Sequence, residues 1–434
     1  MRELSSVSQV AHAIDDVLDA PVLVTGSPPP HGRDLDLLAR CAQSELVRSF
    51  LEQQGFLAWH TTWARFDGHG ALTVELMLGD DWASARGHDG AELMVGAVPL
   101  PGFRHLSRPA PHVQLVLTAQ SLLLRRGRLT PGGRRRATDA AASGPRVWDD
   151  AADLARRLGL TAPVEMLRRS LATPEAWASP RRTAELLLAV GSGPRGVRSA
   201  RARGLVPRRW RPTLVSLSGP DGSGKSTQRA RLRKSLEDAG VPTAGAWVRT
   251  TERPPLPGPL RAFADRWRRP VVTDGATPEP VPALPGRTRR SVPVHVRLAE
   301  RLWITSVVLS NATLVWRGVW QGRTARVLVL DRFVLDAEVK LVYWYALRRG
   351  ADITLERRLF RAICPEPDVA VLLAVAPETN SARRADEWQL HDFRDFRRLY
   401  TAAADELGAV VVDGERPPEV VAREVAEVVW SRLP

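Results

Sequence analysis

Hydrophobic and polar positions in the first part of the chain follow two periods. Short apolar runs and period-two alternation indicate strands, whereas apolar positions repeating every 3.6 residues indicate helices. The predicted elements are a helix over 7–18, strands at 22–26, 34–38, 58–66 and 71–78, and a helix over 44–54. This mixture predicts a small α/β domain over 1–104.

The pattern then changes twice. Period-3.6 spacing dominates 105–190 and predicts a helical extension, with helices at 113–126, 151–158, 164–171 and 183–190. The next segment, 191–212, is rich in Gly, Pro and Arg, which predicts a linker. From 213 to 434 strands and helices alternate, which predicts an α/β domain with a parallel sheet flanked by helices. A proline-rich excursion interrupts it at 254–286.

Composition excludes several classes of protein. The chain has 434 residues, of which 44% are apolar and 25% charged, so it is not mostly disordered, collagen-like or a disulfide scaffold. The formal charge of +14 suggests a polyanionic partner. However, only three of the 62 basic residues are lysines. Because the charge comes almost entirely from arginine, we keep nucleic-acid binding only as an alternative. The two cysteines, Cys41 and Cys364, form no metal-binding pattern and fit a reducing cytoplasm.

Two segments are candidates for membrane association, the N-terminus and residues 302–320, and neither has the expected hydropathy pattern. The N-terminus lacks the apolar core of a signal peptide. The segment 302–320 has the length of a membrane span, but Ser306, Asn311 and Arg317 interrupt it. We therefore expect a buried core helix there, no membrane partner and a cytoplasmic location.

The strongest motif lies between a predicted strand at 213–218 and a predicted helix at 228–239. Residues 219–227 read GPDGSGKST and match the phosphate-loop pattern G-x-x-x-x-G-K-[ST] in its strand–loop–helix context. Glycines let backbone N–H groups face phosphate oxygens, and the helix N-terminus adds its dipole. A lysine neutralises the terminal phosphates and a hydroxyl reaches Mg²⁺. The expected ATP site comprises Gly219, Gly222, Ser223, Gly224, Lys225, Ser226 and Thr227.

Two later strands carry further candidates. The run 325–331 ends in Asp331 followed by Arg332, a carboxylate that could hold Mg²⁺ beside a guanidinium that could reach a phosphate. The strand predicted at 367–377 leads to Arg383 and Arg384, which could close over a transferring phosphoryl group. We expect the catalytic residues to be Lys225, Asp331, Arg332, Arg383 and Arg384, with Ser226 and Asp331 as metal ligands.

From residue 213 onward the chain resembles the thymidylate kinase family of P-loop nucleoside monophosphate kinases. The resemblance rests on GPDGSGKST at 219–227, VLVLDRF at 327–333, PDVAVLLAVAPETNSARRADE at 367–387 and ERPPEVVAREV at 415–425. It implies ATP and Mg²⁺ as cofactors and a small-molecule nucleotide as phosphoryl acceptor. It also implies that Asp221 faces the acceptor and that Arg383 or Arg384 belongs to a lid.

Two departures concern the acceptor side. Where the family usually has a Thr-Arg-Glu-Pro-Gly type turn, residues 249–255 read RTTERPP, which leaves Arg249 and Arg253 as acceptor candidates. The family also usually carries a small hydroxyl residue and then a Tyr-Gln pair after the Asp-Arg-aromatic triplet, but this chain has Asp336 followed by AEVK. The donor side matches and the acceptor side is altered, so the acceptor is left open between dTMP and related small phosphorylated molecules.

The N-terminal segment resembles polymerase-β-like nucleotidyltransferases. Gly26 and Ser27 precede a strand with Asp34 and Asp36, and a later strand carries Glu75. In that family carboxylates on adjacent strands hold metal ions. The resemblance implies a metal site of Asp34, Asp36 and Glu75, with 80–81 competing for the third position. A working copy, a degenerate copy and solvated surface acids stay open.

The sequence therefore predicts an enzyme that transfers the γ-phosphoryl group of ATP to a nucleoside monophosphate or a related small phosphorylated acceptor. The first alternative is a regulatory switch in which ATP binding and hydrolysis act on the N-terminal domain. The second is a basic nucleic-acid-binding protein, which predicts steep salt dependence of binding. A homodimer and the role of 254–286 are left open.

Overall fold

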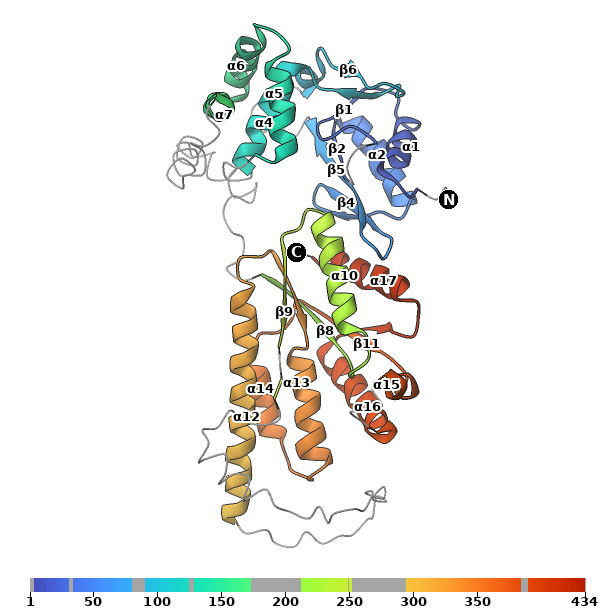
Figure 1. Ribbon diagram of the computed structural model, residues 1–434, viewed down its shortest axis with the longest axis vertical. Helices are drawn as coiled ribbons and strands as arrows, with labels where there is room; N and C mark the ends of the chain where they lie inside the picture. Colours follow the sequence, from blue (N-terminus) through green and yellow to red (C-terminus); the bar gives the residue numbers. More distant parts are fainter. Residues whose placement is uncertain are drawn as a thin grey trace. The chain divides into compact units, whose positions relative to one another are not determined.

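The computed structural model describes residues 4–30, 34–79, 90–124, 129–172, 212–248, 250–251, 294–383 and 389–433 (Figure 1). The chain divides into two compact units, which are described separately. Unit 1 comprises Met1–Arg211, Arg231–Pro242 and Ala422–Pro434, and unit 2 comprises Pro212–Ala230 and Thr243–Val421.

Unit 1 contains a mixed sheet with the strand order β3-β4-β5-β2-β1-β7-β6. β2 pairs with β1 antiparallel and with β5 parallel. The strands are β1 (Val22–Val24), β2 (Asp34–Ala39), β3 (Leu57–Trp59), β4 (Thr62–Phe66), β5 (Ala71–Leu78), β6 (Val98–Pro99) and β7 (Leu106–Arg108). The single run predicted at 58–66 is a hairpin, because the chain reverses at His60, which has a positive φ of 54°. β7 pairs with β1, so the sheet extends past the boundary predicted at 104.

The helices of unit 1 build two cores. They are α1 (Val7–Asp15), α2 (Cys41–Gln53), α4 (Pro111–Leu124), α5 (Pro131–Ala141), α6 (Val147–Leu158) and α7 (Thr161–Ala172), with a 3₁₀ turn η1 (Gly90–Met94). α1 and α2 share one core with the sheet, and α4 to α7 share the other with Leu23 and Leu38 of β1 and β2. The predicted helical extension therefore packs directly on strands of the sheet. The helix predicted at 183–190 lies outside the described residues.

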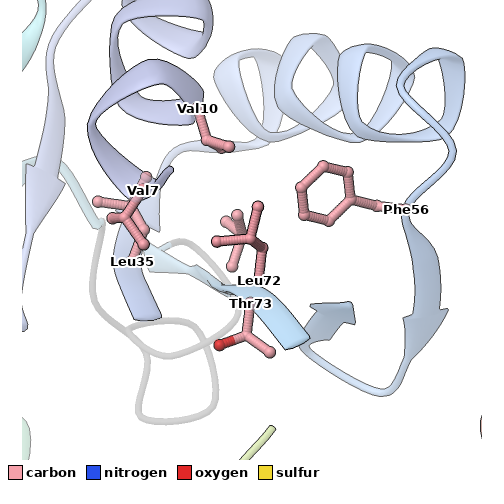
Figure 2. Close-up of a pocket in the computed structure, with 7 residues that line it drawn as sticks. Val7, Val10, Leu35, Phe56, Leu72 and Thr73 are labelled. Carbon is pink, nitrogen blue, oxygen red and sulfur yellow. The ribbon is translucent and has the colours of Figure 1, made fainter. Parts of the chain in front are cut away.

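A shallow apolar depression between α1 and the sheet is filled by its own side chains. Figure 2 shows Val7, Val10, Leu35, Phe56, Leu72 and Thr73 around it. It leaves no space for a water molecule. Protein interiors are ordinarily packed this closely, without space for a water molecule. The depression is therefore part of the core rather than a binding site.

Unit 2 contains a five-stranded sheet with the order β12-β11-β8-β10-β9, and its strands are parallel. The strands are β8 (Thr213–Ser218), β9 (Thr243–Trp247), β10 (Val327–Asp331), β11 (Val369–Ala374) and β12 (Val410–Asp413). Every residue of β8 is buried, as expected of a central parallel strand covered on both faces. The predicted parallel sheet with flanking helices is confirmed.

Helices lie on both sides of this sheet, with α12 on one side and α10 on the other (Figure 1). The helices of the C-terminal half are α10 (Lys225–Asp238), α12 (Val294–Gln321), α13 (Val334–Leu341), the π-helical η3 (Val342–Leu347), α14 (Thr354–Ile363), α15 (Pro377–Arg383), α16 (Leu390–Leu407) and α17 (Pro418–Ser431).

The buried core helix predicted at 302–320 needs correction. Within α12, Val307 and Val315 are fully buried, but Leu302 and Trp320 are 64% and 66% exposed. The helix buries one face against the sheet and α14, and apolar residues also occupy its outer face. Among the described residues, no helix is both long and apolar enough to cross a membrane.

Candidate phosphate site

The phosphate loop leaves the carboxyl end of β8, the strand that lies between β10 and β11. The connection from β8 runs to β9, whereas the connection from its neighbour β11 runs to β12 on the opposite side of β8. The loop therefore lies at a topological switch, where open α/β sheets bind ligands. Gly219 has a φ of +148°, and a Cβ added there would fall 2.7 Å from the carbonyl oxygen of Leu373. Only glycine fits this position without a shift of backbone. Gly222 and Gly224 also have positive φ.

Lys225, the first residue of α10, is buried against the loop. Its Nζ donates to the carbonyl oxygens of Gly219 at 2.6 Å and Pro220 at 2.8 Å. It also lies 3.9 Å from Oδ1 of Asp221. Burial lowers the pKa of Lys225, and the carboxylates of Asp336 and Asp221 oppose that change. The ammonium is thus held among the carbonyl oxygens at the start of the loop.

Ser226 and Asp331 are in direct contact. Ser226 Oγ donates to Asp331 Oδ2 at 2.7 Å, and Arg229 Nη1 lies 3.7 Å from the same oxygen. Asp331 is the last residue of β10, which brings it to the same sheet edge as the loop. A hydroxyl beside a carboxylate is the hard-oxygen set that Mg²⁺ accepts, the ion taking its other ligands from water and phosphate. These two residues therefore fit the predicted metal site.

Arg332 is held in an unusual backbone conformation. Its φ is 63°, although it is not glycine, and its N–H donates to the carbonyl oxygen of Leu217 at 3.2 Å. Its guanidinium forms an ion pair with Asp221 in the phosphate loop. Burial alone would lower the pKa of Arg332, but Asp221, Asp336 and other nearby groups together outweigh it and raise that pKa. Left-handed backbone at a non-glycine residue is typical of functional sites.

Arg383, the last residue of α15, also reaches the loop. Its Nη1 donates to the carbonyl oxygen of Gly222 at 3.0 Å from an exposed position. Thr227 is exposed on the first turn of α10, whereas Ser223 is buried in the loop. The other predicted residues, Arg249, Arg253 and Arg384, lie outside the described residues.

Two residues that sequence reasoning did not assign lie behind the loop. Asp336 accepts hydrogen bonds from the N–H of Gly219 at 3.3 Å and from the hydroxyl of Tyr400 at 2.9 Å. Asp336 is the third residue of α13 and also accepts from the N–H of Phe333, a capping pattern that sequence can suggest. Tyr400 is 64 positions away, and no sequence signal connects the two.

The three acids predicted as a metal site in unit 1 lie on the paired strands β2 and β5, and their role stays a prediction. Asp36 and Glu75 are register partners on β2 and β5, but Asp34 is exposed one pleat away, opposite Thr73. Within the described ranges, no group of three or more His, Cys, Asp or Glu side chains could hold a metal. Residues 80–81 lie outside those ranges.

Two described residues that precede these acids, Gly26 and Ser27, make close contacts. A Cβ on Gly26 would fall 2.2 Å from Asp36 Oδ2, and Arg136 Nη1 donates to Ser27 Oγ at 3.4 Å. Gly26 thus lies directly against Asp36. Nucleotidyl transfer by unit 1 stays a prediction.

Comparison with known proteins supports a P-loop kinase-like half. A probable thymidylate kinase from Pyrobaculum aerophilum is 26% identical over 222 residues, covering 50% of this chain and 95% of the relative. Thymidylate kinases from Thermomicrobium roseum and Jannaschia sp. are 29% and 28% identical, covering 51% of this chain in each case and 93% and 98% of the relatives. Half of this chain therefore has thymidylate kinase homologues.

Two other comparisons add less. No family model matches the chain. The solved structure of a deoxyadenosine kinase from M. mycoides with bound dATP is 13% identical and covers 50% of this chain, with a TM-score of 0.32, which by itself establishes no shared fold.

Proposed function

We propose that this protein is a nucleotide kinase that transfers the γ-phosphoryl group of ATP to a nucleoside monophosphate, with dTMP as the first acceptor to test. The observation that carries the proposal is the ion pair between Asp221 in the phosphate loop and Arg332 after β10, beside the buried Lys225. This arrangement joins donor-binding and acceptor-binding groups. The thymidylate kinase homologues support the same reaction class.

On the donor side, the loop 219–224 and the N-terminus of α10 would bind the phosphates of ATP. Lys225 lies among the loop carbonyls and would move its ammonium onto the terminal phosphates. Ser226 and Asp331, already in contact, would hold Mg²⁺. When bound, that ion neutralises charge on the donor phosphates.

On the acceptor side, Asp221 holds Arg332 next to the phosphate loop. A phosphate bound by Arg332 would therefore lie beside the donor phosphates, which is the alignment that phosphoryl transfer requires. Arg383, bonded to Gly222, would stabilise charge on the phosphoryl group in transit. By sequence, Arg384 would join it in a lid, and Arg249 and Arg253 would contact the acceptor.

An acceptor panel tests the proposal. The full chain is incubated with Mg²⁺ and γ-labelled ATP, together with dTMP, other nucleoside monophosphates, nucleosides or sugar phosphates. We expect label in a nucleoside diphosphate. Stoichiometric ADP with no labelled acceptor would favour the regulatory switch instead, and label on a sugar phosphate or nucleoside would reassign the acceptor class.

A further inference from the structure

Asp336 joins three separate segments through one buried carboxylate. Its Oδ1 accepts from the N–H of Gly219 at 3.3 Å and from the hydroxyl of Tyr400 at 2.9 Å. Its Oδ2 accepts from the N–H of Phe333 at 3.1 Å. The residue is only 1% exposed, so its carboxylate depends on these protein donors.

Each of the three donors belongs to a different part of the site. Gly219 is the first residue of the phosphate loop, and Phe333 directly follows Arg332. Tyr400 lies in the middle of α16, where it is 5% exposed in a core shared with α13 and β11. The carboxylate therefore links the phosphate loop and the backbone next to Arg332 to helix α16.

The charge on Asp336 also acts on both cations of the site. The three donors described for it are neutral groups, so its negative charge is not cancelled by them. Burial lowers the pKa of Lys225, and Asp336 provides the largest opposing effect. The same carboxylate acts on Arg332, second to Asp221. Burial, together with this carboxylate, raises the pKa of Tyr400, so its hydroxyl keeps the proton that it donates.

We propose that Asp336, held by Tyr400, is a positioning residue that sets the distance between the phosphate loop and Arg332, an inference that rests on the proposed phosphoryl transfer. Binding of ATP alone uses the loop, so it depends little on this tie. Transfer depends on the relative placement of the two phosphates, and a misplacement of 1 Å can cost roughly 10²-fold in rate. Loss of the tie therefore lowers kcat while leaving ATP affinity nearly unchanged.

Two variants of graded severity test the inference. Tyr400→Phe removes one hydroxyl and leaves the ring in its core. Asp336→Asn removes the negative charge and replaces one acceptor oxygen with an amide NH₂ group, which can only donate. The matched control is Tyr345→Phe, which also alters a buried tyrosine in unit 2, one whose hydroxyl accepts from Trp303 Nε1 at 2.9 Å. For each protein, kcat is measured in the transfer reaction, the Kd of Mg·ATP by calorimetry and Tm by thermal unfolding.

We expect kcat to fall about tenfold in Tyr400→Phe and about 10²-fold in Asp336→Asn, with Kd for Mg·ATP changed less than about threefold. Tyr345→Phe should keep the wild-type kcat. Unchanged kcat in both site variants, or a parallel loss of kcat and ATP affinity, would overturn the inference and leave the kinase proposal standing. If the wild-type protein phosphorylates no acceptor, the kinase proposal fails. The variants are then compared by their rates of ATP hydrolysis. Rates equal to wild type in both site variants would overturn the inference as well.

Discussion

Ser226 Oγ lies 2.7 Å from Asp331 Oδ2, which connects the first turn of α10 to the last residue of β10. The contact depends on the parallel register in which Asp331 pairs with Leu217 of β8. The hydroxyl and the carboxylate come from positions 105 residues apart, yet they form one oxygen-rich pair beside the phosphate loop. Such a pair can bind a hard divalent cation.

Removing either oxygen should weaken the use of Mg²⁺. We expect Ser226→Ala and Asp331→Asn to raise the Mg²⁺ concentration for half-maximal transfer roughly tenfold, because each removes one of few protein ligands. Initial rates over a Mg²⁺ series at saturating ATP give this value. Ser235→Ala, a buried serine on the same helix, is the control. A half-saturation point equal to that of wild type in both site variants would exclude this pair as the metal site.

Asp221 and Arg332 should act as a unit. Their ion pair means that each holds the other, so Asp221→Asn and Arg332→Ala should each lower kcat/KM by about 10²-fold, and the double variant should lose little more. The double-mutant cycle is measured with the best acceptor of the panel. Arg323→Ala, which removes a guanidinium lying over the Trp320 ring, is the control. Losses that simply multiply would contradict the coupling.

Gly219→Ala should damage the loop itself. The added methyl would meet the carbonyl oxygen of Leu373 at 2.7 Å and Ser223 Oγ at 2.9 Å, so the backbone must shift. We expect ATP affinity to fall about tenfold or more, which corresponds to ~1.4 kcal/mol and matches the usual cost of such strain. Calorimetric titration with Mg·ATP measures it.

The comparison variant for that titration is Gly408→Ala, at a positive φ of 61° with open space around it. It should lower Tm through backbone strain alone and leave ATP affinity unchanged. Equal ATP affinities in the two glycine variants would contradict the close packing of the loop.

Asp15 should stabilise unit 1 in a pH-dependent manner. Its carboxylate accepts from the N–H groups of Arg104 at 2.7 Å and of His105 and Leu106 at 2.8 Å each. Burial alone would raise the pKa of Asp15, but these three donors outweigh it and hold the pKa below 3.8. A depressed pKa stabilises the fold above pH 3.8, and this stabilisation is lost as the pH falls through the lower folded-state value.

Asp15→Asn should therefore cost about 1–3 kcal/mol at neutral pH, because one N–H loses its acceptor. The difference from wild type should shrink below pH 3.8. Urea unfolding between neutral and acid pH measures it, with Glu45→Gln, an exposed residue of α2, as control. A difference that stays constant down to the lowest pH would refute the role of the charge.

The local features of this protein could be predicted from its sequence, whereas most of its tertiary contacts could not. The strand predicted at 213–218 and the loop after it follow from apolar run, glycines and lysine, all of which act locally. α5 was missed because its first turn has few apolar residues, and only the cap at Thr130 and the proline at Pro131 indicate a helix. The tie between Asp336 and Tyr400 could not be predicted, since it exists only when α13 packs on α16.

The exposed side of α12 shows the same limit. Apolar residues on both faces predicted burial throughout, but burial depends on what packs there, and the sheet covers one face only. The pairing of Asp36 with Glu75 likewise depends on strand register, which sequence alone does not give.

The kinase proposal is tested most directly by comparing Lys225→Ala with Lys234→Ala. The measurement is the transfer of label from γ-labelled ATP to a nucleoside monophosphate. Both substitutions remove a lysine from α10, but Lys225 is buried at the phosphate loop and Lys234 is exposed. The kinase proposal predicts that Lys234→Ala forms labelled nucleoside diphosphate at the wild-type rate and that Lys225→Ala loses at least about 10²-fold. Equal rates of transfer in Lys225→Ala and wild type would contradict it.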